Sequence, residues 1–274
     1  MPARMRLLNR TAVVTGAASG IGRAMAVSLS RRGCHLALAD VDEAKLEETG
    51  RMAAADGVRV SRHRIDVADR SAVAAFPQSV LAEHAGADVL VNNAGVAIGG
   101  TFEEASEEDF EWLFGINFWG VVRMTRAFLP LLTKSDDARV VNISSVFGLI
   151  SPPGQTAYAS SKFAVRGFSN ALRHELAGSH IGVTVVHPGG IATSIADNAR
   201  PPKNATAEEI AQRRALFKKV ARLPAEVAGE TIVKGMERRA ARVLVGRDAK
   251  MMAIIERLAP VSYWRILGQI LPTA

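Results

Sequence analysis

The sequence predicts an α/β protein built on a doubly wound, seven-stranded and mainly parallel sheet with helices on both faces. Short apolar segments rich in β-branched residues alternate strictly with segments of helical periodicity along the 274 residues. This alternation requires crossover connections, which make consecutive strands parallel. The expected strands are apolar almost throughout, as they are when both faces of a sheet are buried.

The individual elements follow one another in regular order. Apolar runs such as TAVVT and DVLVN predict strands at residues 11–15, 35–39, 59–65, 88–92, 139–144, 183–187 and 242–245, with 59–65 the weakest pattern. Helical spacing predicts helices at residues 21–32, 43–55, 71–84, 107–132, 157–176 and 225–239. Neither a linker nor an internal repeat divides these elements, so we expect residues 1–274 to form a single domain.

Two segments depart from this rhythm. Residues 192–223 contain a proline-rich stretch, ARPPKN, followed by a charged segment of helical pattern. Because an insertion of this length in a compact domain is usually functional, we expect it to be a substrate lid. Residues 248–274 form an apolar C-terminal extension interrupted by a few charges. This stripe predicts a helix packed on the domain or on a partner subunit; the alternative is that it lines a wide pocket or rests on a membrane.

The composition is that of a folded protein in a reducing compartment. The chain is 48% hydrophobic, and its single cysteine, Cys34, excludes an internal disulfide and is expected to be a small buried residue. The N-terminus shows no apolar stretch of signal type, and no apolar run approaches the roughly 20 residues of a transmembrane helix. We expect a cytoplasmic protein; peripheral membrane contact through the C-terminus is the alternative.

The formal net charge of +7 comes from one region. Residues 200–250 carry 13 lysines and arginines against 6 acidic residues, whereas the rest of the chain carries 21 of each. This excess could attract an acidic partner, an anionic membrane or an anionic substrate, although a solvated helix surface is the interpretation we favour. Phe217 is the only aromatic residue of the region, so the pattern does not indicate nucleic-acid binding.

A glycine-rich turn, TGAASGIG at residues 15–22, lies between the first strand and the first helix. Gly16 permits a tight turn, Gly20 lets the backbone approach a pyrophosphate, and Gly22 lets helix and strand pack closely. The start of the helix, with Ser19 and Ile21, offers free N–H groups to phosphate. In this position the turn predicts a dinucleotide site on a Rossmann-like fold.

Asp40 lies at the end of the second strand, 18 residues after Gly22. A carboxylate there can accept hydrogen bonds from both ribose hydroxyls of adenosine and repels a 2′-phosphate. The sequence therefore favours NAD over NADP, which remains the alternative cofactor. A simpler interpretation is that Asp40 only caps the helix that follows.

Tyr158 and Lys162 are four residues apart on a segment of helical periodicity, so they share a face. A phenol with a pKa near 10 is a poor acid–base catalyst at neutral pH. A cation one turn away stabilises the phenolate and is expected to lower that pKa. Tyr158 could then take a proton from an alcohol as hydride leaves it, or return the proton to an alkoxide.

With these motifs in place, the sequence resembles a one-domain member of the short-chain dehydrogenase/reductase family. The matching pieces occur in family order between residue 11 and about residue 195; beyond residue 200 the resemblance is only general. They are TGAASGIG, Asp40, Asp66-Val67, NNAG at 92–95, Asn117 with Gly120, Ser145, Tyr158-x-x-x-Lys162, and Pro188-Gly189 with Thr193.

The resemblance implies roles for further residues. It selects Ser145 to hold the substrate oxygen and Asn117 to anchor a water for proton relay, and it gives Lys162 a second contact with the nicotinamide ribose. Asp66 and Val67 would lie at the adenine. Asn93, Ala94 and Gly95 would border the cofactor on one side. A second group would border it at its nicotinamide end: Pro188, Gly189, Ile191 and Thr193. The histidines show no metal-ligand spacing, so no metal is expected.

The predicted activity is hydride transfer between NAD and a secondary alcohol or ketone. The segment 146–150 is uncharged, which favours a bulky apolar substrate. The alternatives are a 3-oxoacyl carrier-protein reductase, with the basic region docking an acidic carrier, and a non-catalytic dinucleotide-binding protein. The family also implies a homodimer or homotetramer formed through helices 107–132 and 157–176, which carry Phe118, Trp119, Val122, Phe163, Val165 and Phe168.

Overall fold

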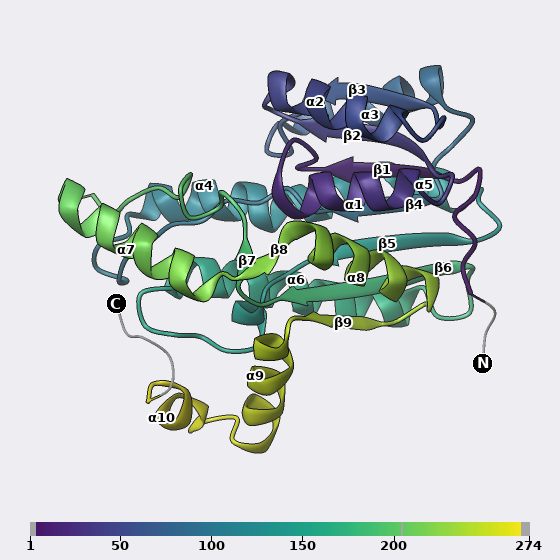
Figure 1. Ribbon diagram of the computed structural model, residues 1–274. Helices are drawn as coiled ribbons and strands as arrows, with labels where there is room; N and C mark the ends of the chain where they lie inside the picture. Colours follow the sequence, from purple (N-terminus) through teal and green to yellow (C-terminus); the bar gives the residue numbers. More distant parts are fainter. Residues whose placement is uncertain (1–3, 204, 270–274) are drawn as a thin grey trace.

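The computed structural model describes residues 4–203 and 205–269, and its centre is a twisted parallel sheet (Figure 1). Seven strands lie in the order β3-β2-β1-β4-β5-β6-β9, and every pair of neighbours is parallel. The strands are β1 (Thr11–Thr15), β2 (His35–Asp40), β3 (Val60–Arg64), β4 (Val89–Asn92), β5 (Ala138–Ile143), β6 (Ile181–Pro188) and β9 (Arg242–Val245). The predicted α/β, Rossmann-like fold is confirmed.

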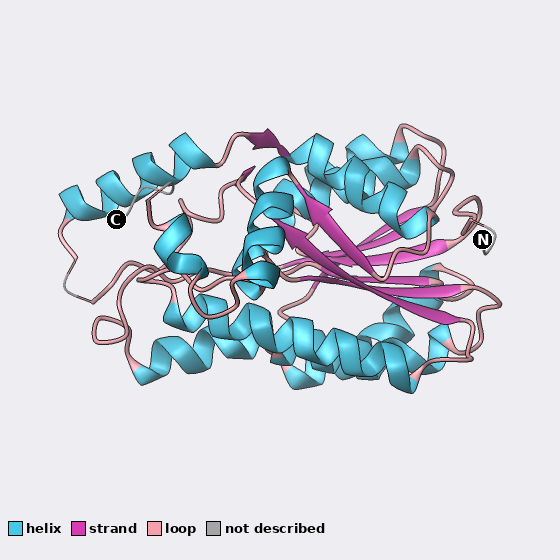
Figure 2. Ribbon diagram, turned by 90° about the horizontal axis from the view of Figure 1, so that it is seen from below, coloured by secondary structure: helices cyan, strands magenta, loops and turns pink. Residues whose placement is uncertain are grey.

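Helices cover both faces of this sheet, as Figure 2 shows from below. The first layer is formed by α1 (Gly20–Ser30), α2 (Glu43–Ala54) and α8 (Ala225–Glu237), whose apolar residues pack with Val14, Leu38 and Val91 of the strands. The second layer is formed by α3 (Arg70–Glu83), α5 (Trp119–Leu132) and α6 (Thr156–Glu175), which bury Val13, Leu90 and Val140. Alternate strand residues therefore enter opposite halves of the core.

The helix expected at residues 107–132 is two helices, so that prediction was too simple. Helix α4 (Glu107–Asn117) is separated from α5 (Trp119–Leu132) by a single residue, Phe118, whose φ is −112° and ψ −58°. The side chain of Asn117 is tied to the backbone of Val96 by two hydrogen bonds of 2.8 and 3.0 Å. This tertiary contact holds the end of α4 at the loop that follows β4.

The insertion at 192–223 begins after a short strand, β7 (Ile191–Ala192), and contains helix α7 (Ala207–Val220); β8 (Leu223–Pro224) pairs with β7. Its proline-rich part lies against the loop after β4, because Arg200 forms a bridge with Ile98 and stacks 3.6 Å from the ring centre of Trp112. Arg200 also pairs with Asp109 at 3.3 Å. The insertion is therefore held across the carboxyl end of the sheet.

The C-terminal extension forms α9 (Arg247–Leu258), which lies beside β9, and α10 (Tyr263–Leu267), which lies next to α9 (Figure 1). The inner side of α9 packs, through Ala249 and Met252, on Val146 and Ile150 of the segment after β5. Part of the apolar stripe thus packs on the protein itself, as expected, while Ile270 and Leu271 fall outside the described residues. Within residues 4–203 and 205–269, no helix is long and apolar enough to cross a bilayer.

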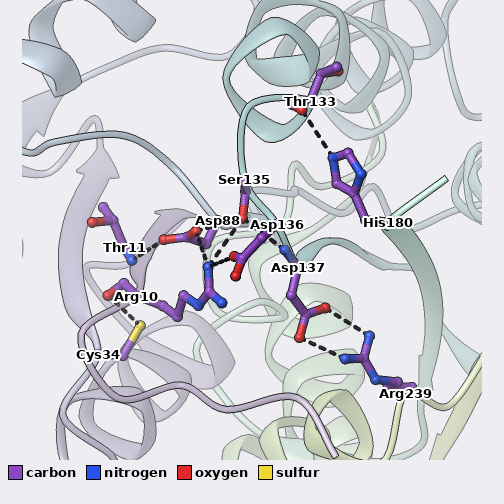
Figure 3. Close-up of polar contacts among 10 residues, drawn as sticks. All are labelled: Arg10, Thr11, Cys34, Asp88, Thr133, Ser135, Asp136, Asp137, His180 and Arg239. Atoms are coloured by element: carbon purple, nitrogen blue, oxygen red, sulfur yellow. Dashed lines mark hydrogen bonds and ion pairs between the residues drawn. The ribbon is translucent and has the colours of Figure 1, made fainter. Parts of the chain in front are cut away.

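Charged and polar groups tie the strands together at the amino end of the sheet (Figure 3). Asp88 accepts hydrogen bonds from the Thr11 amide at 2.8 Å and from Arg10 at 3.0 Å. Arg239 forms a bidentate pair with Asp137, with both bonds at 2.7 Å. Cys34 is buried beside this network, as predicted for it. The network lies at the end of the sheet opposite to the predicted functional residues.

Candidate active site

The predicted functional residues gather at the carboxyl ends of the parallel strands. The glycine turn follows β1, Asp40 ends β2, Asp66 follows β3, Asn93 follows β4 and Ser145 follows β5. The strand order reverses direction between β1 and β4. In open α/β sheets, ligands bind in the crevice at such a switch point.

Backbone conformation and close packing explain the glycines of the first turn. Gly16 and Gly20 have φ of +63° and +52°, a region that other residues enter at a cost. A Cβ on Gly22 would overlap the carbonyl oxygen of Gly16. Ser19 caps α1 without a side-chain hydrogen bond, and Ile21 packs on the core. The first turn of α1 therefore presents backbone donors where a pyrophosphate can approach.

The turn is fastened to the end of β4 by polar contacts. The side-chain amide of Asn93 donates to the carbonyls of Thr15 and Gly16, both at 3.0 Å. The hydroxyl of Thr15 accepts from the amides of Asn93 and Ala94 at 3.0 and 3.1 Å. Asn93 thus fixes the shape of the glycine turn. This role is more specific than the expected one, which was only to border the cofactor.

Asp40 points toward the glycine turn. One carboxylate oxygen accepts from the amide of Ala18 at 2.9 Å, and the other accepts from the amide of Asp42 at 3.1 Å. The cap of α2 is Asp42, whose side chain accepts from the Lys45 amide at 3.0 Å. Asp40 is therefore not the helix cap, and its carboxylate lies beside the turn where an adenosine ribose would be held.

These residues fit an NAD(P) cofactor. The fit depends on two features. The glycine turn before and at the start of α1 has no Cβ at positions 16, 20 and 22, so its backbone is open to a ligand, and the carboxylate of Asp40 lies next to it. Asp66, exposed after β3, accepts from the amide of Ala68 at 2.8 Å, and Val67 is buried against Gly120. Both lie at the carboxyl edge of the sheet, next in order after Asp40.

The catalytic candidates come together between β5 and α6. The ammonium of Lys162 lies 5.6 Å from the ring centre of Tyr158 and donates to the carbonyl of Ile143 at 3.2 Å. The side chain of Ser145 caps the short helix η1 (Val146–Gly148), accepting from the Phe147 amide at 3.1 Å. The ring of Phe147 meets that of Tyr158 edge to face, with centroids 6.2 Å apart.

Burial controls the protonation of this group. It raises the pKa of the Tyr158 phenol to about 12, although a hydrogen bond with Ser145 opposes the shift. Burial also lowers the pKa of the Lys162 ammonium to about 8. The expectation that the pKa of Tyr158 would be lowered is therefore not met in the protein alone, because desolvation of the phenolate outweighs the hydrogen bond with Ser145.

Asn117 and Gly95 lie next to Lys162. A Cβ on Gly95 would lie 3.1 Å from Oδ1 of Asn117 and 3.3 Å from Nζ of Lys162. Asn117 is fully buried, and its amide nitrogen donates to Ser161 of α6 at 3.2 Å as well as to Val96. The structure thus places Asn117 beside Lys162, but with its side chain committed to protein groups.

The segment after β6 closes the far side of the site. Thr193 packs over Gly20, with its methyl group 3.0 Å from where a Cβ would be. Pro188 ends β6, and Ile191 is buried in the β7–β8 pair. His187 is a buried strand residue whose ring donates to the Ser145 carbonyl at 2.9 Å, and burial lowers its pKa to about 4. It is therefore neutral and holds the backbone of Ser145.

Sequence reasoning missed Asp248, in the first turn of α9. Its carboxylate accepts from the amide of Gly190 at 2.6 Å, and a Cβ on Gly189 would overlap it. Asp248 thus fixes the Pro188–Gly190 segment at the nicotinamide end of the site. The Pro-Gly-Gly sequence hints that another group approaches closely, but nothing in the pattern points to a residue nearly 60 positions later.

We expect Asp248→Ala to weaken NADH binding about tenfold, since a buried hydrogen bond to a carboxylate contributes about 1.5–3 kcal/mol and its loss frees the loop. Asp248→Asn, which keeps the acceptor oxygen, should recover most of that affinity. NADH fluorescence titration measures both, with Glu256→Gln on the same helix as control. Unchanged NADH affinity in Asp248→Ala would contradict a positioning role.

The fold and the site together define a class of protein. A Rossmann-like sheet with a glycine turn after β1 and an acidic residue at the end of β2 is a dinucleotide-binding domain. The Ser145, Tyr158 and Lys162 group beside that crevice supplies acid–base chemistry. This combination defines an oxidoreductase of the α/β class.

The family is established by comparison with known proteins. A family model described as short chain dehydrogenase matches residues 10–204. A Mycobacterium tuberculosis protein named "Putative oxidoreductase SadH" is 44% identical over 261 residues, which cover 94% of each chain. The chain therefore belongs to the short-chain dehydrogenase/reductase family and is an oxidoreductase of that family.

Solved structures support the same assignment. A short-chain dehydrogenase/reductase from Burkholderia phymatum in complex with NAD is 32% identical and superposes with a TM-score of 0.85 over 93% of this chain and 95% of that one. A short-chain dehydrogenase from Streptomyces avermitilis is 29% identical, with a TM-score of 0.79 over 95% of this chain and 98% of that one. Both likenesses cover more of the chain than the residues 10–204 that the family model matches.

Proposed function

We propose that the protein interconverts a secondary alcohol and a ketone with NAD(H), using Tyr158 as the general acid and base. The observation that carries this proposal is the Tyr158–Lys162 pair: the buried ammonium lies 5.6 Å from the centre of the half-buried phenol ring, and Ser145 lies beside it. A tyrosine and a lysine that only stabilised a helix would lie on its exposed surface, not together beside a dinucleotide crevice.

Each protein group has a defined task in this reaction. A nicotinamide cofactor held by the glycine turn and Asp40 would supply or accept the hydride. Tyr158 gives its phenolic proton to the substrate oxygen during reduction and takes it back during oxidation. The hydroxyl of Ser145 donates a hydrogen bond to the same oxygen, and the ammonium of Lys162 stabilises the phenolate when it forms. Ser145 and Lys162 are buried and Tyr158 is half-buried, so water has limited access to the group, which strengthens all of these contacts.

Asp40 supports NAD as the preferred cofactor, because its carboxylate lies beside the glycine turn and repels a 2′-phosphate. We expect kcat/KM to be higher with NAD(H) than with NADP(H), and Asp40→Ala to narrow the difference by about tenfold, which corresponds to about 1.4 kcal/mol. A panel of alcohols and ketones assayed with both cofactors by nicotinamide absorbance measures this. The control is Asp42→Ala, which removes the cap of α2 and the ion pair with Lys45 but leaves the Asp40 carboxylate in place. A native preference for NADPH would refute the role of Asp40.

Phe147 supports a substrate with a large apolar group. Its part-exposed ring stands edge to face on Tyr158, so it borders the reacting carbon. Val146 and Ile150 pack inward with α9, and Phe147 also packs against that cluster, so only part of the segment expected to line the pocket faces the site. The same panel tests this preference: turnover confined to small polyols, or to a thioester on an acidic carrier, would contradict it.

Exposed aromatic residues support assembly into a homo-oligomer. Phe118 contacts both Trp119 and Phe168 edge to face, and Trp119 is 49% exposed. Val165, in contrast, is fully buried inside the chain and is not available to a partner. We expect light scattering to give the mass of a dimer or tetramer, and Trp119→Ser to lower it. A monomer at micromolar concentration would contradict the proposal.

A further inference from the structure

One face of α9 is exposed along its whole length and carries only cations and aliphatic side chains. Its positions recur at the three- and four-residue spacing of a single helix face. They are Arg247, Lys250, Met251, Ile254, Arg257 and Leu258, with Val261 just past the helix end; we call this set the outer face of α9. The helix therefore has two apolar sides, and only the inner one packs on the protein.

The exposure of the aliphatic residues is larger than packing within one chain requires. Ile254 is 60% exposed, Leu258 79% and Val261 94%. They follow one another at intervals of three to four residues along a helix that lies at the margin of the molecule, beside β9 (Figure 1). A contiguous apolar strip at such a place indicates an interaction surface.

The cations on this face are available for a partner. Many cations of the basic region are already neutralised: Arg200, Arg213 and Lys218 pair with Asp109, Glu104 and Asp197. By contrast, Arg247, Lys250 and Arg257 have no ion pair with any residue of the part of the chain that the structure describes. The two acidic residues of α9, Asp248 and Glu256, lie off the outer face.

We propose that the outer face of α9 docks the protein on an anionic lipid surface. Aliphatic residues flanked by cations on a helix surface suit the boundary between headgroups and acyl chains, where both find a partner. A second copy of the chain fits less well, because a two-fold interface would place three cations against three cations. This docking is separate from the proposed reaction, since none of these side chains belongs to the catalytic or cofactor-binding groups.

Vesicle binding by the full-length protein tests the proposal. We expect it to co-sediment with vesicles of phosphatidylcholine and phosphatidylglycerol but not of phosphatidylcholine alone, and to be released by salt. Lys250→Gln with Arg257→Gln should lower the partition coefficient about 25-fold, at about fivefold for each cation. Ile254→Ser with Leu258→Ser should lower it at least tenfold.

The matched control is Arg51→Gln with Lys134→Gln, which removes two exposed cations elsewhere and should leave binding unchanged. Circular dichroism and NADH fluorescence titration establish that each variant is folded. Absence of binding to anionic vesicles, or equal loss in the control, overturns the proposal. The proposal is also overturned if Ile254→Ser with Leu258→Ser binds vesicles as strongly as the unmodified protein, because attraction by charge alone would then explain the binding. A smaller mass by light scattering for Ile254→Ser with Leu258→Ser, without any vesicle binding by the unmodified protein, would assign the face to a second copy.

Discussion

Tyr158→Phe is expected to lower kcat by roughly 10²–10⁴-fold, the contribution of a positioned general acid or base. The substitution removes one oxygen and leaves the ring, which keeps its edge-to-face contact with Phe147. Affinity for NADH should change little, because the glycine turn and Asp40 do not contact the phenol oxygen. Turnover assays with fluorescence titration of NADH separate the two effects. Phe147→Leu is the matched control, because it alters the same contact without removing a proton donor. Turnover of Tyr158→Phe at the normal rate would refute the mechanism.

The pH dependence of the reaction follows from the same pair. Burial lowers the pKa of Lys162 to about 8 and raises that of Tyr158 to about 12, so the first proton that this pair of neighbours loses comes from Lys162. Below this pH the pair holds both protons and can donate one to a ketone. Above it the pair can accept a proton from an alcohol. The rate of reduction should therefore fall, and that of oxidation rise, as pH increases through about 8, and Tyr158→Phe should abolish both dependences.

Gly22→Ala is the second change with a large expected effect. The added Cβ would overlap the Gly16 carbonyl oxygen and approach Nδ2 of Asn93, two groups that cannot move without opening the turn. Overpacking of this kind costs about 1–3 kcal/mol of stability. NADH affinity should also fall at least tenfold, because the amides of the turn lose their alignment.

Gly86→Ala is the matched control, since a Cβ at Gly86 meets nothing within 4 Å. Thermal unfolding and NADH titration compare the two variants, and Gly86→Ala should behave like the unmodified protein. If Gly22→Ala bound NADH with normal affinity, close packing of α1 on the glycine turn would not be needed for the site.

The parts of the site that could be predicted are those set by local pattern. The glycine turn, Asp40 and Ser145 lie at strand ends, and strand ends are visible in the sequence because apolar runs stop there. Tyr158 and Lys162 were predictable as neighbours because four residues on a helix make one turn. Their places in the structure agree with the prediction, whereas their catalytic roles stay predictions until turnover is measured.

The rest depends on tertiary contacts that no local pattern records. Asp248 reaches Gly190 only because α9 packs back on the sheet. The break between α4 and α5 comes from the side chain of Asn117 bonding to Val96. The sequence predicts a lowered pKa for Tyr158 because the charge of Lys162 is visible in it. Burial, which is not visible in the sequence, raises that pKa instead.

The contacts of Arg200 have a kinetic consequence. Its guanidinium is stacked on Trp112 and paired with Asp109, both in α4, and its backbone is joined to Ile98 in the loop after β4. Three interactions therefore hold the insertion to the segment formed by this loop and α4. A bulky molecule that enters or leaves between these two segments must break them together. Opening is therefore a separate step with its own barrier, and in an enzyme of this design the release of product can set the upper limit of kcat even when hydride transfer is fast.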